Sequence, residues 1–159
     1  MAMLGRDVVI EDELKKALSD EWAAHYAYWL GSVVIDPARY EDVLTEFVEH
    51  SSQEYDHAVE IAVWLWKYNG QEQVSSSLNQ LLRTRNCEYI DTRDTTPAGL
   101  IRHNINAEKC AIEFYTDLLK VLAGRSGYYG ESDLKKLLEW ILEEEKKHLS
   151  DLEKLRRQF

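Results

Sequence analysis

The sequence predicts an all-α fold, a four-helix bundle with one long crossover between its second and third helices. Apolar residues recur at steps of three and four in four long stretches, which is the period of an α-helix. The 159 residues include only 7 Gly and 2 Pro, so few breaks interrupt these stretches. About 25 residues separate the second stretch from the third, and such a crossover lets the two flanking helices run parallel.

The helix boundaries follow from residues typical of helix ends. Both prolines come directly after an N-cap type of residue, in Asp36-Pro37 and Thr96-Pro97, which is the usual order at a helix start. Gly70 is typical of the residue that follows a helix end. We therefore expect a single domain over residues 1–159, with four helices over these ranges: 11–33, 37–69, 97–123 and 132–157.

Two further local signals complete the predicted elements. Ser132 is the candidate N-cap of the last helix, because its hydroxyl can accept a hydrogen bond from the first turn. Three leucines at helical spacing predict a short helix within the crossover: Leu78, Leu81 and Leu82.

The composition excludes several classes of protein. Hydrophobic residues make up 45% of the chain, which is too many for a disordered acidic tail. The net charge of −10 disfavours binding to nucleic acid and favours attraction of cations. No segment has the length and hydropathy of a membrane span, and the first residues lack the apolar region of a secretory signal. We expect a cytoplasmic protein that binds neither nucleic acid nor membranes.

Charged residues interrupt the apolar face of each of the four long predicted helices. Each face carries one glutamate near its centre: Glu21, Glu54, Glu108 and Glu145. In the second and fourth helices a histidine follows three residues later, His57 and His148, and therefore points to the same side. Burying four carboxylates together is very costly unless cations neutralise them. One Glu from each of two helices and Glu-x-x-His from each of the other two is the ligand set of a di-iron or di-manganese site.

The same pattern occurs twice in the chain. Tyr28 follows Glu21 by seven residues, and Tyr115 follows Glu108 by seven residues. Each helix with a Glu alone also precedes a helix with Glu-x-x-His. One such motif arises by chance in an acidic chain, whereas two in register with matching partner helices are a strong signal for a metal site.

This pattern resembles the ferritin-like superfamily over all four helices, and its ligands resemble the bacterioferritin-type ferroxidase centre within one bundle. The resemblance implies a ferritin-like antiparallel four-helix bundle. It also implies that each of two irons has one Glu and one His of its own, with two shared Glu as bridges: Glu21 and His57, Glu108 and His148, and the bridging Glu54 and Glu145. Tyr28 and Tyr115 are expected to orient these ligands through hydrogen bonds.

Two departures from bacterioferritins narrow the resemblance. Bacterioferritins bind haem through a Met directly after the second-helix Glu, but this chain has Tyr55 there and no methionine beyond Met1 and Met3, so no haem is expected. Only 11 residues follow His148, too few for the fifth helix of twenty-four-subunit cages. The chain therefore resembles most the Dps-like miniferritins, or thioferritins, which combine a bacterioferritin-like site with a dodecameric shell.

Thioferritins also have a cysteine pair, one member of which lies two residues after the third-helix Glu. Cys110 stands two residues after Glu108, and Cys87 in the crossover would be its partner. Helical geometry places Cys110 about 200° around the helix from Glu108, so its sulfur does not bind the same metals. An ordinary buried thiol and a redox-active or disulfide-forming pair are equal alternatives.

Two histidines lie close to the expected ligands. His25 and His50 stand four residues from Glu21 and Glu54 respectively, on the ligand faces of their helices. We expect them to pack in the core beside the ligands. Binding of an incoming or outgoing iron is the alternative.

The resemblance implies a ferroxidase that stores and detoxifies iron. Two Fe(II) ions per subunit would be oxidised by hydrogen peroxide or dioxygen, which protects against oxidative stress, and manganese is the alternative metal. A non-storage di-iron or di-manganese oxidoreductase, such as a rubrerythrin-like peroxidase or an oxygenase, is the competing interpretation. The chain has no Cys-x-x-Cys pair of the kind that a rubredoxin domain supplies. A non-catalytic helical module is disfavoured by the glutamates and histidines in the core positions.

Overall fold

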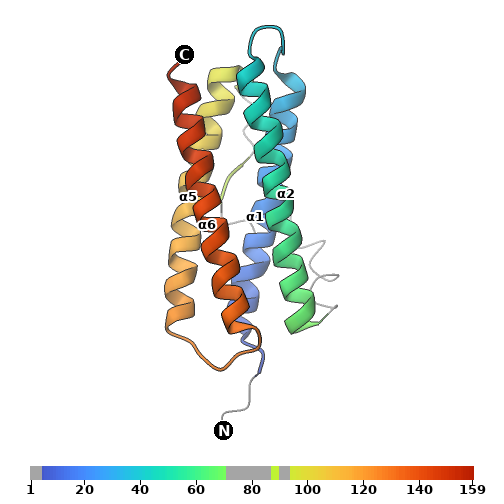
Figure 1. Cartoon of the computed structure of the whole chain (residues 1–159), viewed down its shortest axis with the longest axis vertical. Helices are drawn as coiled ribbons and strands as arrows, with labels where there is room; N and C mark the ends of the chain where they lie inside the picture. Colours follow the sequence, from blue (N-terminus) through green and yellow to red (C-terminus); the bar gives the residue numbers. More distant parts are fainter. Residues whose placement is uncertain (1–4, 71–86, 90–93) are drawn as a thin grey trace.

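The computed structural model describes residues 5–70, 87–89 and 94–159 and places most of them in a bundle of long helices (Figure 1). In the numbering of Figure 1 these helices are α1 (Val8–Val34), α2 (Glu41–Asn69), α5 (Pro97–Ala123) and α6 (Glu131–Arg156). Helices α1 and α2 form one antiparallel pair and α5 and α6 the other, while α2 and α5 run in the same direction. The expected all-α bundle with a long crossover is confirmed.

Several helix ends have the chemistry that the sequence predicts. The Thr96 hydroxyl accepts a hydrogen bond from Gly99 N at 3.1 Å, which caps α5 directly before its first-turn proline. Gly70 ends α2 with a φ of 95°, a conformation that favours glycine. Helix α1 begins at Val8, three residues earlier than expected, because the Asp7 carboxylate accepts a hydrogen bond from Val9 N at 3.0 Å.

The start of α2 differs from the prediction. The helix begins at Glu41, not at Pro37. Asp36 instead closes a separate turn, in which its carboxylate accepts from Ala38 N at 3.0 Å and its carbonyl accepts from Tyr40 N at 3.1 Å. Proline at this position therefore initiates a turn between the two helices.

The start of α6 also differs. Gly130 is the N-cap residue, with a φ of 73°, and Ser132 lies inside the first turn of the helix. The expected short helix around Leu78, Leu81 and Leu82 lies outside the described residues.

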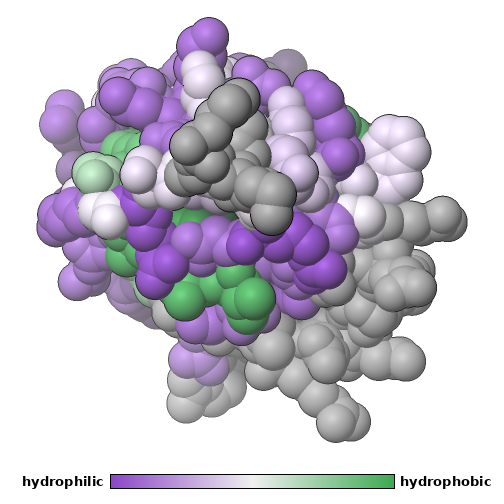
Figure 2. All heavy atoms as spheres, turned by 90° about the horizontal axis from the view of Figure 1, so that it is seen from below, coloured by the Kyte–Doolittle hydropathy of each residue, from purple (hydrophilic) through white to green (hydrophobic). Residues whose placement is uncertain are grey.

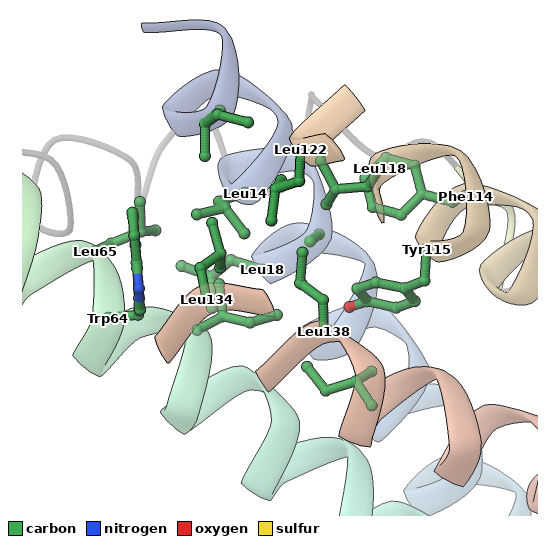
Figure 3. Packing of buried hydrophobic residues seen from close by; sticks show 14 of the residues in the cluster. Leu14, Leu18, Trp64, Leu65, Phe114, Tyr115, Leu118, Leu122, Leu134 and Leu138 are labelled. Carbon is green, nitrogen blue, oxygen red and sulfur yellow. The ribbon is translucent and has the colours of Figure 1, made fainter. Parts of the chain in front are cut away.

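Two apolar clusters fill the bundle, one on each side of its middle. The cluster nearer the N-terminus draws residues from all four helices, as Figure 3 shows for ten labelled side chains: Leu14, Leu18, Trp64, Leu65, Phe114, Tyr115, Leu118, Leu122, Leu134 and Leu138. The cluster at the opposite end includes Phe47, Ile101, Ile105 and Leu152. Each fully buried aliphatic or aromatic side chain contributes about 1.5–3 kcal/mol. These clusters hold the helices on both sides of a polar layer.

The surface is predominantly hydrophilic at the end of the bundle where α1 begins, with smaller hydrophobic patches between polar side chains (Figure 2). None of the helices in the described part of the chain combines the length and hydropathy that a membrane span requires.

Candidate metal centre

The polar layer between the two apolar clusters consists of the six residues that the sequence singles out. Each of them exposes at most 1% of its surface: Glu21, Glu54, His57, Glu108, Glu145 and His148. Their ligand atoms form two overlapping groups, in each of which all atoms lie within 4.8 Å of one another. Glu54 and Glu145 belong to both groups. The helical step of three brings each Glu and its His to the same level of the bundle.

The first group surrounds one nitrogen of His57. Nδ1 of His57 lies 3.2 Å from Oε2 of Glu21 and 3.2 Å from Oε2 of Glu54. The same nitrogen lies 3.3 Å from Oε1 of Glu145. This group therefore combines one imidazole with three carboxylates, one from each of three helices.

The second group repeats this arrangement around His148. Nδ1 of His148 lies 3.2 Å from Oε1 of Glu54 and 3.4 Å from Oε2 of Glu145. Its distance to Oε1 of Glu108 is 3.7 Å. Glu54 and Glu145 thus each turn one oxygen towards His57 and the other towards His148, as carboxylates that bridge two metal ions would do.

The layer contains more polar atoms than its own hydrogen bonds satisfy. Buried atoms without a hydrogen-bond partner include Oε1 of Glu54, Oε2 of Glu108, both carboxylate oxygens of Glu145 and Nδ1 of His148. An unsatisfied buried polar group costs about 1–3 kcal/mol, and a charged one costs more. Carboxylate oxygens and imidazole nitrogens are ligands for iron, manganese and zinc, so the donor set fits a pair of such ions.

The charges in the layer are strongly coupled. Burial, together with the charges of Glu145 and Glu54, raises the pKa of Glu21 well above its ordinary value, and the pKa of Glu108 is raised in the same way. Burial alone would also raise the pKa of Glu54, but the neighbouring His148 and His57 hold it well below its usual range.

The two histidines respond in the opposite sense. Burial alone would lower the pKa of His57 and of His148. The surrounding carboxylates outweigh burial and raise both pKa values far above the ordinary range. In the absence of metal, protons on these groups therefore offset part of the negative charge.

Two buried tyrosines connect the two halves of the bundle. The hydroxyl of Tyr28, on α1, donates a hydrogen bond to Glu108 on α5. The hydroxyl of Tyr115, on α5, donates to Glu21 on α1. Each tyrosine therefore orients the glutamate of the opposite helix. The sequence predicts hydrogen bonds of this kind for both tyrosines.

Two further residues that the sequence analysis missed contact the outer nitrogens of the histidines. Oε1 of Gln53 lies 2.9 Å from Nε2 of His148, and Oε2 of Glu144 lies 3.4 Å from Nε2 of His57. Both stand directly before the Glu of a Glu-x-x-His motif, and each reaches the histidine of the other motif. Their repeated position in the two motifs is the signal that would have identified them. Such partners fix the orientation of a metal-binding imidazole.

Comparison with known proteins identifies the family of this chain. The profile of the ferritin-like domain family matches residues 11–159, nearly the whole chain. The chain belongs to the ferritin-like family. Among solved structures it is similar to a dodecameric thioferritin, the bacterioferritin-related protein of Bacteroides fragilis. The two are 30% identical with a TM-score of 0.77, over 92% of this chain and 83% of the other. No curated protein matched the chain. The ferritin-like resemblance is confirmed.

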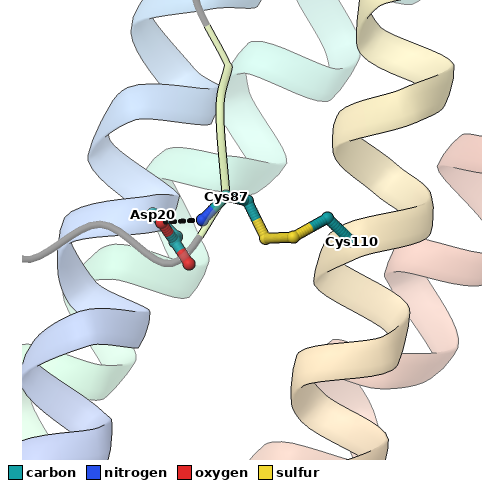
Figure 4. Close-up of a disulfide and its surroundings, with 3 residues drawn as sticks. All are labelled: Asp20, Cys87 and Cys110. Carbon is teal, nitrogen blue, oxygen red and sulfur yellow. Dashed lines mark hydrogen bonds between the residues drawn. A yellow bond between two sulfur atoms is a disulfide. The ribbon is translucent and has the colours of Figure 1, made fainter.

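A disulfide lies beside the candidate metal centre of this ferritin-like bundle. Cys87, from the crossover, is bonded to Cys110 on α5, with 5.8 Å between their Cα atoms (Figure 4). The backbone N–H of Cys87 donates to Oδ1 of Asp20 at 3.0 Å. Asp20 directly precedes Glu21, and Cys110 follows Glu108 by two residues. Of the two alternatives, the structure shows the disulfide-bonded pair and not an ordinary buried thiol. Neither sulfur belongs to a candidate metal group.

A third tyrosine reaches the site from the crossover. Tyr89 is 2% exposed, and its pKa is raised well above the ordinary value by burial and by the charges of Glu108 and Glu145. It packs with Cys87 against alanines of α1 and α5: Ala23, Ala24, Ala27 and Ala107. The sequence analysis missed Tyr89 because it lies outside the periodic helical stretches.

His25 and His50 have different environments. Nδ1 of His25 lies 2.8 Å from the carbonyl oxygen of Ser51 and 3.0 Å from its hydroxyl oxygen. His25 therefore joins α1 to α2. His50 stacks on His148, with 4.2 Å between the ring centroids. Burial and the neighbouring His148 lower the pKa of His50 to about 3, so its ring is neutral.

Metal binding is expected to release protons from this site. The raised pKa values of Glu21, Glu108, His57 and His148 all favour protonated forms, and a metal ion must displace those protons. Metal affinity should therefore rise with pH, with up to about four protons released per chain. Calorimetry with Co(II) in buffers of different ionisation enthalpy measures this release. Binding without proton release would contradict the charge arrangement.

Removal of the disulfide is expected to destabilise the fold. The bond joins residues 23 positions apart, and closing a loop of that length stabilises a protein by about 3 kcal/mol. The double variant Cys87→Ser, Cys110→Ser should therefore lose about 6–12 °C in Tm. Thermal unfolding with and without a phosphine reductant provides the control, because the reductant should affect the wild type alone. An equal Tm for variant and wild type would refute a stabilising bond.

Proposed function

We propose that this ferritin-like protein is a miniferritin that oxidises and stores iron, and that it thereby protects the cytoplasm against oxidative stress. The observation that carries the proposal is the pair of overlapping ligand groups, in which two shared carboxylates face two histidines. Membership of the ferritin-like family supports an iron-related function. We further propose that residues 1–159 act as one domain.

The ligands suit two Fe(II) ions as substrate, with manganese as the alternative metal. Four carboxylates carry a charge of −4 when ionised, which offsets the charge of +4 on two Fe(II) ions. Hard, negatively charged oxygen ligands stabilise Fe(III) relative to Fe(II) and so favour loss of an electron from each ion. The hydrogen bonds from Tyr28 and Tyr115 keep Glu108 and Glu21 in position during this change.

Two electrons, one from each Fe(II), match the needs of the proposed oxidants. Hydrogen peroxide accepts both electrons, its O–O bond breaks, and with two protons it yields two water molecules. Dioxygen accepts the same two electrons and with two protons yields hydrogen peroxide. Two-electron reduction avoids release of the hydroxyl radical that a single Fe(II) would generate from peroxide.

Assembly into a cage would provide the storage volume. The similar protein from Bacteroides fragilis is a dodecamer. Four tryptophans are between 38% and 58% exposed in this chain: Trp22, Trp29, Trp66 and Trp140. Aromatic residues are enriched at subunit interfaces relative to the rest of a protein surface. We therefore propose a homo-oligomeric, dodecameric shell.

Anaerobic titration with Fe(II) followed by hydrogen peroxide tests the oxidation. We expect saturation of fast oxidation at two Fe(II) per chain in the wild type. Glu54→Gln should slow the fast phase at least about 10- to 100-fold, because loss of even an outer partner of a metal ligand has an effect of that size.

Glu60→Gln is the matched control for this variant. Glu60 lies on the exposed face of the same helix and the substitution removes the same charge. Stopped-flow absorbance should give the wild-type rate for Glu60→Gln. An unchanged rate in Glu54→Gln would exclude a bridging role for that residue.

Molecular mass in solution tests the storage function separately. Light scattering after size exclusion should give about 220 kDa, twelve times the chain mass of 18.6 kDa. A monomer or dimer that still oxidises Fe(II) would instead favour the non-storage di-iron oxidoreductase.

A further inference from the structure

The two halves of the candidate metal centre differ at the outer nitrogen of the imidazole. We call the two ligand groups the His57 position and the His148 position, after their histidines. Each combines one imidazole with three carboxylates, and each has a tyrosine that donates to its unshared glutamate. The inner ligands are therefore alike in both positions, whereas the partners of the two outer nitrogens are not.

A carboxylate faces the outer nitrogen of His57. Oε2 of Glu144 lies 3.4 Å from Nε2 of His57, within the range of an ion pair. The Glu144 side chain is 26% exposed, so solvent screens this charge only in part. Trp140 packs against the same imidazole nearly at a right angle, with 5.0 Å between the ring centroids. The His57 position thus has a negative charge behind its imidazole and an indole in contact with it.

A neutral amide faces the outer nitrogen of His148. Oε1 of Gln53 lies 2.9 Å from Nε2 of His148. The amide nitrogen of Gln53 donates to Oε1 of Glu49 at 3.3 Å, which keeps the amide oxygen turned towards the histidine. Glu49 in turn lies 3.8 Å from Nζ of Lys147, which offsets its charge. The direct partner of His148 therefore carries no charge.

This difference changes the strength of the two imidazoles as metal ligands. A metal ion that binds Nδ1 leaves the single ring proton on Nε2. A carboxylate that faces this N–H makes the ring a stronger donor than a neutral amide does, because the hydrogen bond is charge-assisted. Outer partners of a metal-binding histidine alter metal affinity by about 10- to 100-fold.

We propose that the His57 position binds the first divalent metal ion and the His148 position the second, and that Glu144 and Gln53 determine this order. Both act through a histidine and are positioning residues. In the proposed ferroxidase, one Fe(II) would be held at the His57 position before the second completes the pair. That consequence rests on the proposed function, whereas the order of binding for other divalent ions does not.

Anaerobic titration with Co(II) tests the order without any oxidation step. The readout is Trp140 fluorescence, taken as the signal that Trp140→Phe removes. Because Trp140 packs against His57, an ion at the His57 position should quench it more strongly than an ion at the His148 position. We expect most of this quenching with the first equivalent of Co(II). Equal quenching by the first and second equivalents would overturn the proposed order.

Exchange of the two outer partners should reverse the order. The double variant Gln53→Glu, Glu144→Gln keeps the net charge, and most of the Trp140 quenching should move to the second equivalent. Quenching that stays with the first equivalent would refute the role of these two residues. Glu144→Gln alone should lower the overall affinity for two Co(II) at least about 10-fold, measured by calorimetry.

Glu143→Gln is the matched control for the loss of charge. Glu143 directly precedes Glu144, is 71% exposed and pairs with Lys146 at 2.6 Å. This variant should keep the wild-type affinity and order. A loss of affinity equal to that in Glu144→Gln would assign the effect to net charge and would overturn the proposed contact with His57.

The same titrations separate this inference from the proposed function. Ordered binding of two Co(II) by a protein that does not oxidise Fe(II) would support the order and contradict the ferroxidase. A single Co(II) that quenches Trp140 and binds more weakly in Glu144→Gln would support the preference for the His57 position and contradict the paired centre. Fast Fe(II) oxidation with equal quenching by both equivalents would contradict the order alone.

Discussion

The burial of four carboxylates and two imidazoles in one layer is the constraint on which the rest of this structure depends. Such a layer is stable only when its charges are balanced, by protons in the free protein and by metal ions in the loaded one. The apolar clusters on both sides hold the helices in register and keep water out of the layer. A core that was apolar throughout would be more stable, so the polar layer has a functional explanation.

The two helical hairpins support each other's ligands. Tyr28 and Tyr115 each donate to the glutamate of the opposite hairpin, and Gln53 and Glu144 each contact the histidine of the opposite motif. The pattern that occurs twice in the sequence therefore corresponds to reciprocal contacts, in which each hairpin supports the ligands of the other. Contacts across the hairpins thus reach both His57 and His148, and such contacts help to fix the orientation of a metal-binding imidazole.

The fold and the six central residues are predictable from sequence because they follow helical periodicity. What the prediction missed depends on contacts between elements. Asp36 closes a turn instead of starting α2, since its carbonyl bonds to Tyr40, and this choice is decided by the path of the chain between two packed helices. Tyr89 belongs to the crossover, where no helical periodicity predicts which side chains lie near the centre. Likewise, the distance between the two cysteines is set by packing of the crossover against alanines of α1 and α5.

The sharing of Glu54 and Glu145 has a mechanical consequence for the bundle. These residues come from different hairpins, so an ion in either position would be held by both hairpins at once. Each bound ion would act as a reversible cross-link between the two hairpins, whereas the disulfide links the crossover covalently to α5. By mass action, metal binding would make the protein more resistant to unfolding than the metal-free form. A metal ion bound at this centre would therefore also stabilise the fold.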